Sequence, residues 1–233
     1  MTEAGQLVLQ FDHRPAMTGE DFLVAPNNMD AVAWIDRWPA WPSPALCLYG
    51  PGGCGKTHLS EVFRSRSGAH HLPVSRLTET YQPPPARFVV VEDVDQGLSE
   101  DSEEGLFHLY NDLSALGGNL LLTSLSPPSR WAIRLADLRS RMGAANVAEI
   151  LPPDDTLIAA VLVKLFQDRQ LRISQDVIAF TVKRMERSFD AARNLVERAD
   201  RLGLSEKKAI TVPLIKRILE VSSIEGEEKW IWD

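Results

Sequence analysis

The sequence predicts an α/β protein built on a parallel sheet, followed by a small domain made only of helices. Up to about residue 150, short aliphatic runs alternate with segments of helical period, which is the pattern of a parallel sheet covered by helices on both faces. After the paired prolines at 152 and 153, the apolar residues keep a helical period. At 233 residues the chain exceeds one ordinary compact domain, so a core with a smaller appended domain is expected.

Three helices are predicted in the core. The first starts near Asn27 as its cap, carries Ala31 and Ile35 at helical spacing, and ends at a proline-rich stretch. The second is expected over residues 56–65. The third carries an apolar stripe over residues 106–116 and is ended by two glycines.

Four bounded apolar runs are predicted to be strands. Parallel strands that are covered on both faces appear in a sequence as continuous aliphatic segments. The predicted strands are residues 46–49, 88–91, 120–123 and 147–150.

A domain boundary is predicted near residue 151. Four helical stripes follow it, and they begin at Ile158, Val177, Ala192 and Leu214. We therefore expect a tail over residues 1–15, an α/β core over 16–150, and a helical domain with a C-terminal tail over 151–233.

Composition and charge disfavour several classes of protein. The chain has 25 basic and 32 acidic side chains and a net charge of −7, so a broad DNA-coating surface is not expected. Its two cysteines cannot form a disulfide framework and have no partners at metal-ligand spacing. The sequence shows no secretion signal and no apolar run long enough to cross a bilayer. A location in the reducing cytoplasm is expected.

A glycine-rich segment between the first strand and the second helix predicts a phosphate-binding loop, because it fits GxxxxGK[ST]. In such a loop backbone N–H groups turn inward onto phosphates, the lysine reaches the terminal phosphates, and the hydroxyl ligates Mg²⁺. A chance glycine-rich turn is the alternative, but the flanking strand and helix favour nucleotide binding. The predicted binding residues are Gly50, Pro51, Gly52, Gly53, Cys54, Gly55, Lys56 and Thr57.

Two carboxylates directly follow the predicted strand 88–91. Glu92 and Asp93 should therefore lie at the carboxyl edge of the sheet, where α/β proteins bind ligands. Glu92 is expected to hold Mg²⁺ together with Thr57, and Asp93 to activate water. A solvated acidic loop is the alternative, and we expect it for the later acidic residues, which are Asp95, Glu100, Asp101, Glu103 and Glu104.

Four segments together are typical of one family. They are residues 48–59 around the loop, 121–124, 137–141 and 151–155. In these segments the chain resembles the DnaA branch of the AAA+ proteins, where they are the phosphate loop, the sensor I strand, the arginine-finger box and the entry to the lid. The resemblance covers about residues 20–220 and implies an AAA+ P-loop core, with a parallel sheet flanked by helices, and a small all-helical lid.

The first residues resemble the QLxLxF peptide by which bacterial proteins dock on the replication sliding clamp, the β subunit of DNA polymerase III. Leu7, Leu9 and Phe11 would project to one side of an extended peptide, and Gln6 would hydrogen-bond at the rim of a groove. An N-terminal edge strand is the alternative. We expect no room in this chain for the DNA-reading domain of the initiator. A clamp peptide on such a core resembles the Hda-type regulators that inactivate the initiator DnaA.

The resemblance implies a negative regulator of replication initiation that binds ADP or ATP with Mg²⁺ and has DnaA and the clamp as partners. Arg141 would enter the nucleotide site of ATP-bound DnaA as an arginine finger, which can speed hydrolysis by about 10³ to 10⁵. The alternative for Arg141 is a structural residue at a helix end. Strong direct DNA binding and membrane binding are not expected, and self-association is left open.

Several residues depart from the family's pattern. Glu92 replaces the usual aspartate, so at most weak intrinsic ATPase activity is expected. Asp190 stands where the branch has the sensor II arginine, which favours an ADP-bound resting form unless Arg193 or Arg187 contacts the nucleotide. His58 is counted with the nucleotide-binding residues as a residue of the helix N-terminus rather than as a base.

Two other functions are weighed against this one. A helicase loader also carries a phosphate loop and a finger arginine, but it needs a basic, aromatic-studded channel for single strands, which the net charge disfavours. A metabolic P-loop kinase would have an arginine-rich substrate lid near the loop and would not need a clamp peptide.

Overall fold

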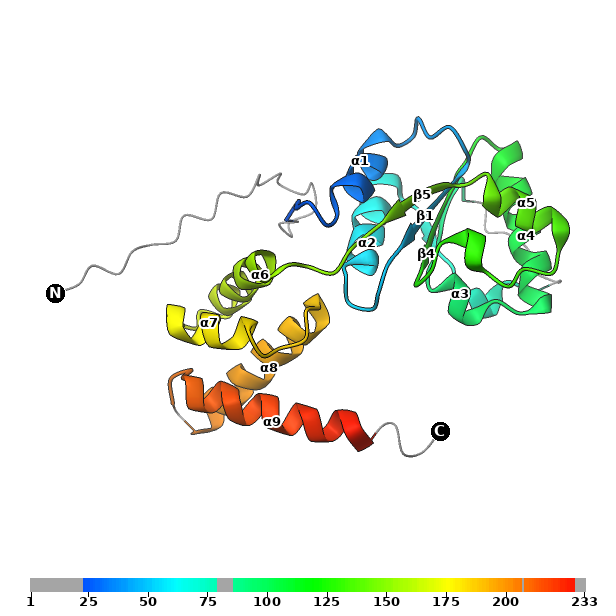
Figure 1. Cartoon of the computed structure of the whole chain (residues 1–233). Helices are drawn as coiled ribbons and strands as arrows, with labels where there is room; N and C mark the ends of the chain where they lie inside the picture. Colours follow the sequence, from blue (N-terminus) through cyan, green and yellow to red (C-terminus); the bar gives the residue numbers. More distant parts are fainter. Residues whose placement is uncertain (1–22, 79–85, 207, 229–233) are drawn as a thin grey trace. The chain divides into compact units, whose positions relative to one another are not determined.

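The computed structural model describes residues 23–78, 86–206 and 208–228, which form two compact units (Figure 1). The chain passes from one unit to the other between Leu151 and Pro152. Within the described ranges, no helix has the length and apolar character needed to cross a membrane.

A five-stranded sheet forms the centre of the first unit. Its strand order is β2-β3-β4-β1-β5, and every pairing is parallel. The predicted α/β class is confirmed, and each of the four predicted strands is present. The additional strand β2 was missed because two histidines carry no aliphatic signal. The strands are β1 (Ala45–Tyr49), β2 (His70–His71), β3 (Phe88–Val91), β4 (Asn119–Ser124) and β5 (Asn146–Glu149).

Helices cover both faces of this sheet, with α1 and α2 on one face and α3, α4 and α5 on the other (Figure 1). Successive strand residues point to opposite faces, so Val90 packs under α1 and α2 while Val89 and Val91 pack under α4. The helices are α1 (Met29–Arg37), α2 (Lys56–Ser67), α3 (Val94–Gly97), α4 (Glu100–Ala115) and α5 (Ala136–Gly143), with short 3-10 turns η1 (Val74–Arg76) and η2 (Pro128–Arg130).

The start of α1 differs in detail from the prediction. Asn28, not Asn27, is the residue before the helix, and its side chain makes no capping bond to α1. Its Oδ1 instead accepts the backbone N–H of Ala25, and its amide donates to the carbonyl of Leu23. The asparagine therefore orders the chain that leads into the helix.

The prediction of a solvated acidic loop after Asp93 is wrong, because its residues lie in α3 and α4, and two of them bond backbone N–H groups. The Asp95 carboxylate accepts the backbone N–H groups of Leu125 and Ser126, at 3.1 and 2.9 Å, and ties the start of α3 to the end of β4. Glu103 is buried, and its carboxylate accepts the backbone N–H groups of Arg134 and Leu135 instead of facing water.

The second unit is all-helical, and its core is separate from those of the sheet. Each of the four predicted stripes is a helix, with fully buried residues such as Leu162, Phe166 and Ile215 between them. Asp154 caps the first helix by accepting the backbone N–H of Leu157 at 2.7 Å. The helices are α6 (Asp155–Asp168), α7 (Gln175–Val182), α8 (Phe189–Glu206) and α9 (Val212–Glu228).

Gly118 is expected to tolerate no side chain. A Cβ there would lie 2.0 Å from the carbonyl oxygen of Arg87, where β3 and β4 begin side by side. Gly118→Ala should lower the free energy of unfolding by about 1–3 kcal/mol, as overpacking does. Urea denaturation measures this change. Gly143→Ala is the control, because a Cβ there would meet nothing within 4 Å beyond its chain neighbours and the backbone of its own helix. Equal midpoints for both variants would contradict the prediction.

Candidate nucleotide-binding site

Three predicted elements of the site meet at one edge of the sheet. Because β1, β3 and β4 are parallel and adjacent, with β4 in the middle, their carboxyl ends lie side by side. The phosphate loop follows β1, the acidic pair follows β3, and Thr123 lies near the end of β4. The topology thus brings the loop and both carboxylate residues together at the edge where α/β proteins bind ligands.

The phosphate loop leaves β1 in a tight conformation that requires glycine. The Gly50 N–H donates to the carbonyl of Ser124, and a Cβ on Gly50 would lie 2.1 Å from the carbonyl oxygen of Ile150. Gly53 and Gly55 have φ values of 66° and 106°, in the left-handed region that side chains disfavour. The glycines therefore allow the sharp turn against β5 and the entry into α2.

Lys56 is held inside the loop. Its side chain is buried, and its Nζ donates to the carbonyl oxygens of Gly50 at 2.7 Å and Pro51 at 2.9 Å. Thr57, the next residue, is exposed in the first turn of α2, and His58 beside it is half-buried. The loop, the ammonium and the positive end of α2 together form a surface suited to a polyphosphate.

Glu92 lies beside the first turn of α2. Its Oε1 is 2.7 Å from the Ser60 hydroxyl, which lies one turn after Thr57, and its Oε2 is 3.2 Å from Nε2 of His71. Sequence reasoning missed both partners. A serine one turn after the lysine of the loop was the available signal for Ser60, whereas nothing in the sequence pointed to His71.

The oxygen ligands at this edge fit Mg²⁺. Thr57 supplies an exposed hydroxyl, and the contact with Ser60 brings the Glu92 carboxylate to the same end of α2. Magnesium usually takes one or two such protein ligands, with phosphates and water completing the octahedron. Among the described residues, no group of three or more His, Cys, Asp or Glu side chains could hold a metal without a nucleotide.

Asp93 adopts an uncommon backbone conformation. Its φ of 51° is in the left-handed region, and its N–H donates to the Thr123 hydroxyl at 3.0 Å. Its side chain is exposed at the edge that carries the phosphate loop. Backbone strain of this kind concentrates at functional sites.

Arg141 does not join this site. It lies exposed in the last turn of α5, with its guanidinium 5.8 Å from the centre of the Tyr110 ring. The chain then enters β5 at Asn146. Because β5 is parallel to β1, its amino end lies at the edge of the sheet opposite the phosphate loop (Figure 1). The structure therefore separates the predicted finger from the protein's own nucleotide site.

The lid arginines have acidic neighbours within the helical unit. Arg193 is exposed on α8, with its Nη1 3.9 Å from Oδ1 of Asp190. Arg187 donates a 2.7 Å hydrogen bond to Asp155, which lowers the pKa of that carboxyl. The predicted clamp-binding residues, Gln6, Leu7, Leu9 and Phe11, lie outside the described residues.

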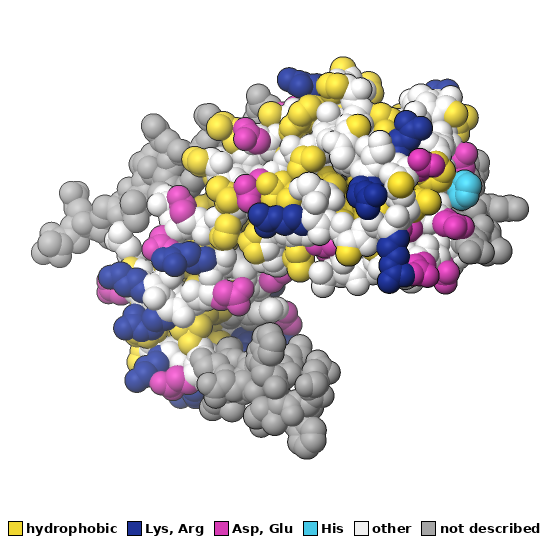
Figure 2. All heavy atoms as spheres, turned by 45° about the vertical axis from the view of Figure 1, so that its right-hand side comes forward, with side chains coloured by type: hydrophobic (Ala, Val, Ile, Leu, Met, Phe, Trp, Pro, Cys, Tyr) yellow, Lys and Arg dark blue, Asp and Glu magenta, His cyan; other side chains and the backbone are white. Residues whose placement is uncertain are grey.

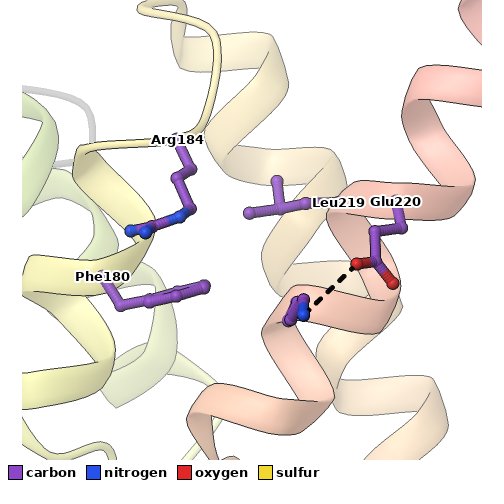
Figure 3. Close-up of a pocket in the computed structure, with 5 residues that line it drawn as sticks. Phe180, Arg184, Leu219 and Glu220 are labelled. Carbon is purple, nitrogen blue, oxygen red and sulfur yellow. Dashed lines mark ion pairs between the residues drawn. The ribbon is translucent and has the colours of Figure 1, made fainter.

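A small pocket of about 250 Å³ lies between α7 and α9 (Figure 3). The Arg184 guanidinium lies 4.1 Å from the centre of the Phe180 ring, and Lys216 forms an ion pair with Glu220 at 3.7 Å. Ligand pockets usually exceed about 300 Å³ and enclose much of the ligand. This one is smaller, and its charged groups already contact an aromatic ring or each other.

Charge on the face drawn in Figure 2 is mixed. Lys and Arg side chains lie among Asp and Glu side chains there.

Comparison with known proteins finds relatives of the DnaA and Hda type. The model of the family described as "Hda, lid domain" matches residues 154–219. The chain is 28% identical to the chromosomal replication initiator protein DnaA of Thermomicrobium roseum, over 86% of this chain and 48% of that one. The chain is an AAA+ protein related to DnaA and Hda. It is also 25% identical to an uncharacterized protein of Haemophilus influenzae, over 76% of this chain and 82% of that one.

Solved structures agree with the fold of this DnaA/Hda-related protein. Domain III of Thermotoga maritima DnaA superposes with a TM-score of 0.72 at 17% identity, over 85% of this chain and 93% of that one. AMPPCP-bound DnaA from Aquifex aeolicus gives 0.69 at 17% identity, over 91% of this chain and 71% of that one. The protein spans about half the length of the DnaA sequences that it matches.

Cys47 is expected to be inert as a nucleophile. It is fully buried on β1, and burial raises the pKa of its thiol from 9.0 to about 12. The pKa of Cys47 is higher in the folded protein than in the unfolded chain, so the neutral thiol contributes fully to the free energy of unfolding below pH 9.0. That contribution is lost as the pH rises toward 12. At pH 8 Ellman's reagent should detect no thiol until denaturant exposes Cys47 and the buried Cys54. Rapid labelling of Cys47 in folded protein would contradict this expectation.

Proposed function

We propose that this protein binds an adenine nucleotide and stimulates the hydrolysis of ATP bound to DnaA, and so restrains the initiation of replication. One observation carries the proposal. Arg141 is exposed at the sheet edge opposite the protein's own phosphate loop, on a chain related to DnaA and Hda. A guanidinium so placed is available to the nucleotide of a second AAA+ protein and is turned away from its own.

The protein's own nucleotide site serves chiefly to bind. The loop amides and Lys56 hold the phosphates, while Thr57 and Glu92 would hold Mg²⁺, which neutralises phosphate charge when bound. Ser60 and His71 already contact both oxygens of Glu92, so its carboxylate is less free to serve the metal. We therefore expect weak ATP hydrolysis by the protein alone, with Asp93 as the residue that orients water. Asp190 at the sensor II position favours an ADP-bound resting form.

In the complex, Arg141 acts as an arginine finger. Charge builds up on the phosphoryl oxygens of the ATP held by DnaA as the bond to the leaving group breaks, and a guanidinium stabilises that charge. Arginine suits this role because its planar donors stay charged and match phosphate oxygens. The clamp would bring the two proteins together on DNA through the N-terminal segment that contains Gln6, Leu7, Leu9 and Phe11, which lies outside the described residues.

Arg141→Ala is expected to reduce the stimulated hydrolysis of DnaA-bound ATP by at least about 10³-fold, the lower end of what an arginine finger contributes. The measurement is single-turnover release of phosphate from ATP-loaded DnaA, in the presence of clamp loaded on DNA. Nucleotide binding by the Arg141→Ala variant should be unchanged, because Arg141 lies away from this protein's phosphate loop. The Lys56→Ala variant should lose nucleotide binding. Stimulation that survives Arg141→Ala would refute the proposal.

Removal of residues 1–12 is expected to abolish binding to the sliding clamp without changing nucleotide affinity. The physical reason is that the proposed clamp anchors are confined to this segment, while the phosphate loop belongs to the folded core. Surface plasmon resonance on immobilised clamp measures clamp binding, and titration with fluorescent ADP measures nucleotide affinity. Clamp binding by the shortened protein would show that another surface docks on the clamp.

A further inference from the structure

A buried carboxylate outside the nucleotide site supports the entry to α5. Glu103 on α4 is only 5% exposed. Its Oε2 accepts the backbone N–H groups of Arg134 at 3.0 Å and Leu135 at 2.8 Å, and its Oε1 also lies 3.1 Å from the N–H of Arg134. Leu135 is the residue that precedes α5, the helix that carries Arg141.

A second contact joins the same two helices at their other ends. Tyr110 on α4 is buried, and the Arg141 guanidinium lies 5.8 Å from the centre of its ring, within the range of a cation–π contact. Tyr110 follows Glu103 by seven residues, and Arg141 follows Leu135 by six. At a rise of about 1.5 Å per residue these separations are about 10 and 9 Å, so the two contacts match along the helices.

We propose that α4 holds the finger helix in place, with Glu103 and Tyr110 as positioning residues for Arg141. The inference rests on the proposed function, because it assigns these residues to the action of Arg141 on a second protein. Glu103 fixes where α5 starts, and Tyr110 fixes the guanidinium at the last turn. Neither residue touches the nucleotide; both act through α5.

The physical reason is that α5 is poorly fixed by its own sequence. It has eight residues, and its N-cap residue, Leu135, makes no side-chain capping bond. Isolated helices of this length are marginal in water. A buried carboxylate that accepts backbone N–H groups makes charge-assisted bonds, and a ring face limits the rotamers of a long arginine. A group that is already oriented loses less entropy when it reaches the reacting phosphate.

The test compares Glu103→Gln with Glu104→Gln. Glutamine removes the charge and brings an amide NH₂ toward two backbone donors, so Glu103→Gln should loosen α5. Glu104 is the neighbouring exposed carboxylate on the same helix and is the matched control. In the single-turnover assay with ATP-loaded DnaA, Glu103→Gln should lower the maximal rate at least ten-fold. The concentration that gives half-maximal stimulation should stay within about three-fold of the original, because Arg141 remains present but misplaced.

Hydrogen exchange tests the same idea in the full-length protein without DnaA. Backbone amides of α5 should exchange at least ten-fold faster in Glu103→Gln than in Glu104→Gln, while amides of β1 and β4 stay equally protected. Tyr110 gives a second, independent pair of variants. Tyr110→Phe keeps the aromatic ring face and should keep the stimulation of ATP hydrolysis. Tyr110→Leu removes that face and should lower the stimulated rate at least three-fold.

The outcomes separate the two ideas. If Arg141→Ala abolishes stimulation but Glu103→Gln and Tyr110→Leu retain it within two-fold, the positioning role is wrong and the proposed function stands. If Arg141→Ala itself retains stimulation, the proposed function is wrong, and α4 can be assigned no role in it even if the exchange of α5 changes. If Glu103→Gln fails to fold, as loss of protection in β1 and β4 would show, the two Tyr110 variants decide.

Discussion

The parallel pairing of β4 with both β1 and β3 determines where every functional group of the core lies. It places the phosphate loop after β1 beside the carboxylates after β3, and the Thr123 hydroxyl bonds the Asp93 N–H between them. It also places the amino ends of these strands together at the other edge of the sheet. Because β5 pairs in parallel with β1, the chain must return to that opposite edge before β5 begins, and α5 brings Arg141 there.

Several acidic side chains act as connections to the backbone in this protein. Asp95 bonds two N–H groups after β4, and Glu103 bonds two N–H groups before α5. Peptide N–H groups outside regular structure need acceptors when they are removed from water, and a carboxylate can serve two at once. The acidic balance of the chain thus reflects structural acceptors as well as solvated charge.

Periodicity and motif predicted most of the fold because both are local properties. The aliphatic runs, the four stripes of the lid and the loop from Gly50 to Thr57 could be recognised from neighbouring residues alone. Contacts between distant segments could not. Asp95 and Glu103 belong to an acidic stretch whose pattern is the same whether its members face water or bond a backbone segment some 30 residues away. The partners of Glu92 likewise come from a helix and a short strand with no shared sequence signal.

The two edges of the sheet impose different physical demands. At the carboxyl edge, backbone amides and a helix N-terminus suit an anion that is held for long periods, so the groups there can be rigid in the free protein. At the opposite edge, a finger must be exposed to reach a partner, and exposure leaves a long arginine side chain mobile unless something fixes it. In our proposal the buried Glu103 and Tyr110 on α4 meet that demand, since they hold α5 and its arginine while Arg141 stays exposed. An exposed group can therefore be ordered without being covered.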